Sequence, residues 1–85
     1  MTKQEQIALA AKLLNLTTDE IQANSDIIPE LAALYVSIPI KSVYSLIVGN
    51  DGEVLYADST VGYTKHLKAY KEGKRTPIES FNIEK

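Results

Sequence analysis

The feature that most constrains this fold is a pair of apolar, β-branched-rich runs on either side of Asn50-Asp51-Gly52. Asp-Gly is among the strongest short-range signals for a β-hairpin, because both residues tolerate positive φ. The segment therefore predicts a central antiparallel hairpin with strands over residues 43–48 and 53–58.

Both faces of this predicted hairpin are apolar. With Asp51 and Gly52 as the two central turn residues, Val48 lies opposite Leu55 and Ile47 lies opposite Tyr56. One face then carries Tyr44, Leu46, Val48, Leu55 and Ala57, and the other carries Val43, Ile47, Val54 and Tyr56. A hairpin with one wet face would alternate apolar and polar residues. The predicted hairpin therefore needs cover on both sides.

Two arrangements supply that cover. Helices of the same chain can pack on both faces, or they can pack on one face while a second copy covers the other, as in an isologous dimer. We favour the dimer, and we predict an interface formed by Val43, Ile47, Val54 and Tyr56.

Two helix starts are visible in the first third of the chain. Thr2 and Glu5 form a capping box, and apolar residues at helical spacing follow, which predicts a helix over residues 3–14. Thr17 is followed by Asp19 and Glu20, whose carboxylates suit the positive end of a helix dipole. A short second helix is expected to run to about residue 23.

Two further helices are predicted, one before the hairpin in the chain and one after it. Pro29 suits a first helical position, so we expect a third short helix over residues 30–35. Asp58, Ser59 and Thr60 are candidate caps for a last helix, which Gly73 ends near residue 72. The fold class is therefore α+β: N-terminal helices, a central antiparallel hairpin and a C-terminal helix, with residues 76–85 as an extended tail whose end frays.

The length and composition place these elements in one domain over residues 1–85, because a second core would not fit. The chain has no cysteine, which excludes disulfides and thiolate metal sites. Its first residues are polar rather than basic and then apolar, and no apolar run approaches the ~20 residues that span a bilayer. We therefore expect a cytoplasmic protein.

Charge is unevenly distributed along the chain. Residues 61–75 hold five cations and a single carboxylate, whereas the chain as a whole has a net charge of −2. The cations are Lys65, Lys68, Lys71, Lys74 and Arg75. This basic helix, residues 63–75, is a candidate contact for an anion or a nucleic acid. Cations at this spacing are also typical of a solvated helix face that pairs with acidic residues, which is the interpretation we favour.

Residues that could carry chemistry are few. His66 is the only histidine, and no serine lies in a nucleophile elbow, so we expect His66 to pack beside Tyr63 and Tyr70. An anion site at residues 59–62, assisted by Lys65, is a weaker alternative to ordinary helix capping. We predict no catalytic residues, no cofactor and no metal site.

The sequence thus favours a small non-catalytic binding or interaction module that is homodimeric through one hairpin face. The alternative hypothesis is a nucleic-acid-associated accessory protein that uses the basic helix. An enzyme is the least favoured class.

Overall fold

The computed structural model describes residues 1–38, 44–58 and 61–81. The fold is α+β, as predicted. Its elements are, in chain order, α1 (Lys3–Leu14), α2 (Thr18–Ala23), β1 (Ser25–Ile28), the 3₁₀ turn η1 (Pro29–Leu31), β2 (Ala33–Ile38), β3 (Tyr44–Val48), β4 (Val54–Asp58), α3 (Tyr63–Lys71) and the 3₁₀ turn η2 (Ile78–Ser80).

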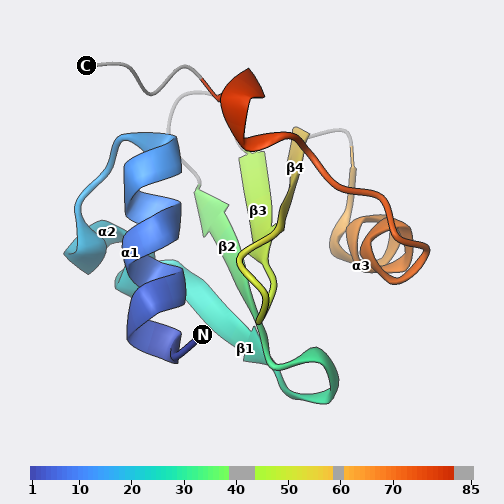
Figure 1. The fold of residues 1–85 in the computed structure, drawn as a ribbon, viewed down its shortest axis with the longest axis horizontal. Coiled ribbons are helices and arrows are strands. Elements are labelled where there is room, and N and C mark those ends of the chain that lie inside the picture. Colours follow the sequence, from blue (N-terminus) through green and yellow to red (C-terminus); the bar gives the residue numbers. More distant parts are fainter. Residues whose placement is uncertain (39–43, 59–60, 82–85) are drawn as a thin grey trace.

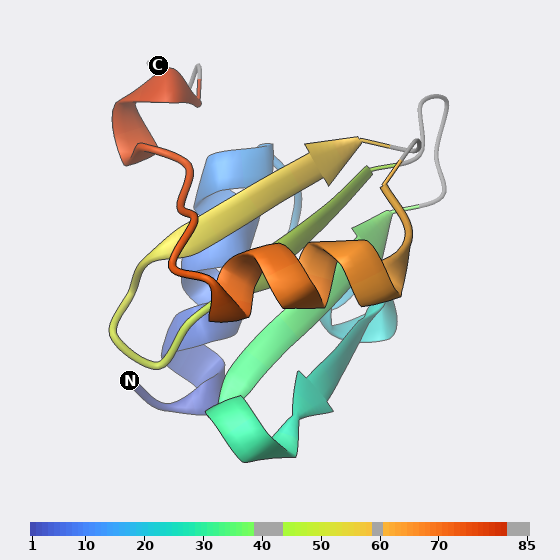
Figure 2. The ribbon, with the colours of Figure 1, turned by 90° about the vertical axis from the view of Figure 1, so that its right-hand side faces the viewer.

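The four strands form one antiparallel sheet in the order β1-β2-β3-β4. Figure 1 shows α1 and α2 together on one side of the sheet. Figure 2 shows α3 crossing the opposite face, with α1 behind the sheet. The described part of the chain therefore has three layers, with helices on both faces of the sheet.

The two N-terminal helices begin where their capping signals predict. The Thr2 hydroxyl accepts the Glu5 amide at 3.1 Å, and the Glu5 carboxylate accepts the Thr2 amide at 2.8 Å. Thr17 and Glu20 form a second capping box at the start of α2. Each box satisfies backbone N–H groups that would otherwise lack a partner at a helix start.

The helix predicted over residues 30–35 is wrong. Only Pro29–Leu31 is helical, as a single 3₁₀ turn, and Ala32 then adopts a left-handed conformation with φ of 50°. The chain before this turn forms β1, which the sequence analysis missed, and the chain after it forms β2. β2 lies between β1 and β3, so its backbone pairs on both sides. That pairing outweighs the weak helical preference of the segment.

The hairpin β3–β4 is present, but its predicted register is wrong by one residue. Val48 pairs with Val54 instead of Leu55, and Leu46 pairs with Tyr56. The loop has three residues, because Gly49 N donates to the Glu53 carbonyl at 2.7 Å and Gly52 adopts φ of 86° as the extra residue. A one-residue shift exchanges the two faces of β4.

Both faces of β3 are nevertheless covered, as the apolar pattern required, whereas Tyr56 of β4 stays 41% exposed on the α1 side. The cluster on the α1 side contains Ile7, Ala10, Ala11, Leu13, Ile21, Leu34, Val36, Ile38, Leu46, Val48 and Val54. The cluster on the α3 side contains Ile28, Ala33, Ile47 and Tyr70. The chain itself thus supplies a helical layer for each face of the sheet.

The chain leaves α3 and returns along the outer edge of β4. Gly73, with φ of 95°, ends α3 as predicted, since its amide and that of Lys74 bond back to the last turn. Thr76 N then donates to the Val54 carbonyl at 2.8 Å, and the Tyr56 amide donates to the Thr76 hydroxyl at 2.9 Å. The predicted extended tail instead contains the turn η2, and residues 82–85 lie outside the described residues.

No helix within the described residues is long and apolar enough to cross a bilayer.

Candidate functional site

The four residues predicted as an interface do not lie on one exposed surface. Ile47 is fully buried on the α3 side, and Val54 is buried on the α1 side. Tyr56 shares the α1 side with Val54 and is 41% exposed. Val43 lies outside the described residues. Of the three that are described, only Tyr56 is available to a partner.

Tyr56 lies at the centre of an aromatic patch, which we define as Tyr44, Tyr56 and Phe81. The ring centroids of Tyr44 and Tyr56 are 5.7 Å apart, and those of Tyr56 and Phe81 are 6.1 Å apart in an edge-to-face arrangement. Both separations fall in the range of favourable aromatic pairs. Tyr44 and Phe81 are partly buried against the core below, so they hold Tyr56 from two sides.

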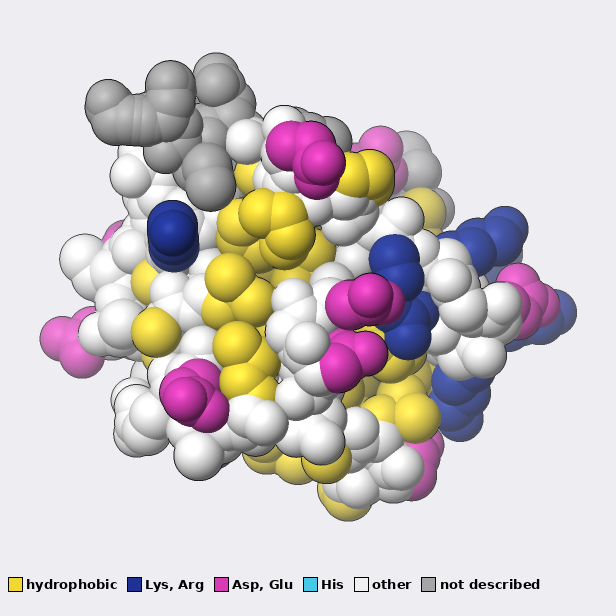
Figure 3. All heavy atoms as spheres, in the orientation of Figure 1, with side chains coloured by type: hydrophobic (Ala, Val, Ile, Leu, Met, Phe, Trp, Pro, Cys, Tyr) yellow, Lys and Arg dark blue, Asp and Glu magenta, His cyan; other side chains and the backbone are white. Residues whose placement is uncertain are grey.

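The aromatic patch lies where α1 leaves the sheet uncovered. α1 packs on β2 and β3, whereas Tyr56 projects from β4 on the same face. Figure 3 shows hydrophobic side chains gathered in a strip between α1 and β4 on this side of the molecule. Burial raises the pKa of the Tyr44 phenol, and the neighbouring Tyr56 and Glu20 raise it further. None of the three side chains of the patch is a Lys, Arg, Asp or Glu.

Sequence reasoning found Tyr56 but missed Tyr44 and Phe81 as its neighbours. The predicted register placed Tyr44 and Tyr56 on opposite faces, whereas the observed register places Tyr44 opposite Asp58, on the same face as Tyr56. Phe81 reaches Tyr56 because the chain returns along β4 after α3. No local signal near residue 81 predicts that return.

The basic helix is partly committed to contacts within the molecule. The Lys71 ammonium lies 3.6 Å from the Glu30 carboxylate, and Arg75 Nε lies 3.3 Å from that of Glu53. Lys65, Lys68 and Lys74 are exposed. Two of the five cations on the predicted anion or nucleic-acid surface are thus paired with acidic residues of the same chain.

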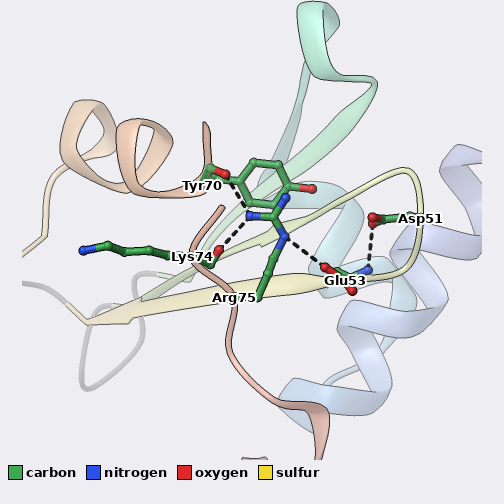
Figure 4. Close-up of polar contacts among 5 residues, drawn as sticks. All are labelled: Asp51, Glu53, Tyr70, Lys74 and Arg75. Carbon is green, nitrogen blue, oxygen red and sulfur yellow. Dashed lines mark hydrogen bonds and ion pairs between the residues drawn. The ribbon is translucent and has the colours of Figure 1, made fainter. Parts of the chain in front are cut away.

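Arg75 has the most contacts of these cations. Its guanidinium carbon lies 3.6 Å from the centre of the Tyr70 ring, and its Nη1 donates to the carbonyls of Tyr70 and Lys74 (Figure 4). These bonds satisfy carbonyl groups at the end of α3, where a cation is favourable to the helix dipole. Together with the Glu53 contact, they tie the end of α3 to the β3–β4 loop. Arg75 therefore acts as a structural clamp.

His66 is more deeply buried than its position beside Tyr63 and Tyr70 suggested, with 1% of its surface exposed. Its Nε2 lies 2.7 Å from the Leu55 carbonyl, and its ring packs against Tyr35 of β2 at 5.7 Å between centroids. A shallow cavity of about 310 Å³ lies beside it, lined by Leu55, Tyr56, Ala57, Asp58, Val61, His66 and Ala69. Burial lowers the pKa of the His66 imidazole, and its bond to Leu55 opposes this effect.

The start of α3 differs from the predicted capping arrangement. Gly62 is the N-cap residue and no side chain caps the helix there, while residues 59 and 60 lie outside the described residues. The predicted anion site at residues 59–62 is therefore only partly described. Among residues 1–38, 44–58 and 61–81, no group of three or more His, Cys, Asp or Glu side chains is arranged to hold a metal ion.

Comparison with models of protein families, with curated proteins and with solved structures found no match for this chain.

Proposed function

We propose that this protein is a small non-catalytic interaction module that forms a homodimer through the aromatic patch of Tyr44, Tyr56 and Phe81. The observation that carries the proposal is the exposure of Tyr56: 41% of this large ring is accessible, although Leu46 and Val54 beside it are buried. Surfaces of this kind are typical of association sites, where tyrosine side chains contribute strongly to binding.

The composition and rigidity of the aromatic patch suit a contact between two copies. Tyr56 is held between Tyr44 and Phe81, so little side-chain freedom remains to be lost on binding. The patch contains no Lys, Arg, Asp or Glu, so its own side chains bring no like charges together in a dimer, and the nearby Glu20 carboxylate acts on Tyr44 from outside the patch. The surface of α3 exposes Lys65 and Lys68, so two copies meeting there would bring positive charges together.

The position of the patch also supports a twofold arrangement. Among the described residues, α1 packs on β2 and β3 and no α-helix packs on β4 from that side, so an element from a second copy placed beside α1 would complete that layer. In an isologous dimer each copy offers the same patch, so Tyr56 of one copy packs against the aromatic patch of the other.

Solution mass as a function of concentration tests this proposal. The wild-type mass should rise from that of one chain toward that of two as the concentration increases from micromolar to near-millimolar. Tyr56→Lys should keep the protein monomeric without unfolding it, because a charge on an exposed strand position disrupts a dry contact and leaves the core intact.

Tyr63→Lys is the matched control, since Tyr63 is 46% exposed and lies on α3, on the opposite side of the sheet. This variant should dimerise like the wild type. A wild-type protein that is monomeric at every concentration would refute the homodimer, and equal loss of dimer in both variants would refute its location.

A further inference from the structure

α3 is attached to the sheet mainly by two buried side chains, His66 and Tyr70. The cluster on the α3 side has four buried hydrophobic residues, compared with eleven in the cluster on the α1 side. One of the two side chains that hold α3 on this smaller core, His66, is therefore both titratable and 1% exposed.

The hydrogen bonding of His66 determines which ring nitrogen carries its proton. The Leu55 carbonyl can only accept, so Nε2 donates to it and Nδ1 is the unprotonated nitrogen of the neutral ring. Nδ1 is buried and has no hydrogen-bond partner among the described residues. A second proton would therefore create a buried N–H and a positive charge that no acceptor in the described part of the chain satisfies, which is unfavourable in the folded state.

The groups around His66 do not offset that charge. Tyr35 faces it from β2, and Tyr63 and Tyr70 lie one turn before and one turn after it on α3. None of these three side chains is a carboxylate that could pair with a charged imidazole. Asp58 lines the same cavity from the end of β4, but it is exposed, so water screens its carboxylate.

We propose that His66 makes the docking of α3 acid-sensitive: protonation at Nδ1 releases α3 from the sheet while α1 and α2 stay packed on the other face. Release would uncover Ile47, Leu55 and Tyr35, which form an apolar surface under α3. The opening is local because His66 is the only histidine of the chain and it packs on the α3 side of the sheet.

Amide hydrogen exchange of the whole protein tests this between about pH 7.5 and pH 5.5. After correction for the intrinsic exchange rate, the protection of the α3 amides should be constant at high pH. Below about pH 6.5 it should fall roughly tenfold per pH unit, the slope expected when opening takes up one proton. The α1 amides should keep their protection over the same range.

The variant His66→Gln tests whether protonation of His66 causes the pH dependence. Its amide group can still donate to the Leu55 carbonyl but cannot be protonated, so the α3 amides should lose their pH dependence even if their protection is lower overall. An unchanged slope in this variant would overturn the proposal.

If the variant does not fold, hydrogen exchange of the wild-type protein alone still tests the proposal. Loss of α1 and α3 protection together as the pH falls would indicate global unfolding and would overturn the proposal. So would α3 protection that does not respond to pH.

Discussion

Tyr70 of α3 places its hydroxyl against Gly49 at the end of β3, in space that a Cβ at position 49 would also occupy. Asp51 Oδ1 and the Glu53 carbonyl would lie 2.9 and 3.2 Å from the same Cβ. Gly49 therefore allows the end of α3 and the β3–β4 loop to approach each other closely, at the point where Arg75 ties them together (Figure 4).

Gly49→Ala should lower the free energy of unfolding by about 1–3 kcal/mol, because the added methyl group overpacks a closed contact. The measurement is chemical denaturation. In a Tyr70→Phe background, which removes the hydroxyl, the same substitution should cost less. Equal losses in both backgrounds would show that Tyr70 is not the obstacle.

Gln6 is a second residue whose role depends on the tertiary structure. It is 2% exposed, and its Nε2 donates to the Ala32 carbonyl at 3.0 Å and to the Val48 carbonyl at 3.1 Å. Gln6→Ala should lower the free energy of unfolding by about 1–3 kcal/mol, because it removes the donor to two carbonyls inside the protein. Gln4→Ala, at an exposed position of the same helix, should have little effect in the same denaturation experiment.

The two covered faces of β3 can be tested with adjacent residues. Leu46 packs under α1 and Ile47 packs under α3, and both are fully buried. Leu46→Ala and Ile47→Ala should each lower the free energy of unfolding by about 2–5 kcal/mol, as expected for large core residues. Ile27→Ala, at a 41% exposed position of β1, serves as the control and should cost far less. A small effect of Ile47→Ala would mean that α3 does not seal its side of the sheet in solution.

Arg75 should matter more for stability than its lysine neighbour. Arg75→Ala removes the stacking on Tyr70 and the bonds to the end of α3, and it should lower the free energy of unfolding by about 1–2 kcal/mol. Lys74→Ala keeps the backbone carbonyl that Arg75 uses and should be nearly neutral. Thermal unfolding of the two variants compares these effects. Equal losses of stability in the two variants would contradict the role of Arg75 as a structural clamp.

The parts of this fold that were predicted correctly depend on neighbouring residues. The capping boxes at Thr2 and Thr17, and the end of α3 at Gly73, each arise from hydrogen bonds within a few positions of the chain. The Asp51-Gly52 turn and the apolar runs beside it likewise predicted a hairpin that needs cover on both faces. These features could be predicted because the residues that contact each other in them are also close together in the sequence.

The parts that were wrong or missed depend on contacts between distant segments. Leu34 and Tyr35 are in a strand because β1 and β3 pair with them on both sides, and Ala33 pairs with β1. The register of β4 depends on whether Gly52 is a turn residue or a bulge, and Asp-Gly suits both. Phe81 contacts Tyr56 only after the chain has passed along α3 and back.

The sequence by itself therefore determined the class of the fold, the ends of α1 and α2, the C-terminal end of α3 and the two-sided apolar hairpin. Only the tertiary structure decided that the chain itself covers both faces of β3, that Ile47 and Val54 are buried on opposite sides, and that Tyr56 remains exposed among aromatic neighbours. The physical reason is that local preferences amount to fractions of a kcal/mol per residue, whereas burial of a large side chain contributes about 1.5–3 kcal/mol. Which side chains are buried is settled when distant segments pack together.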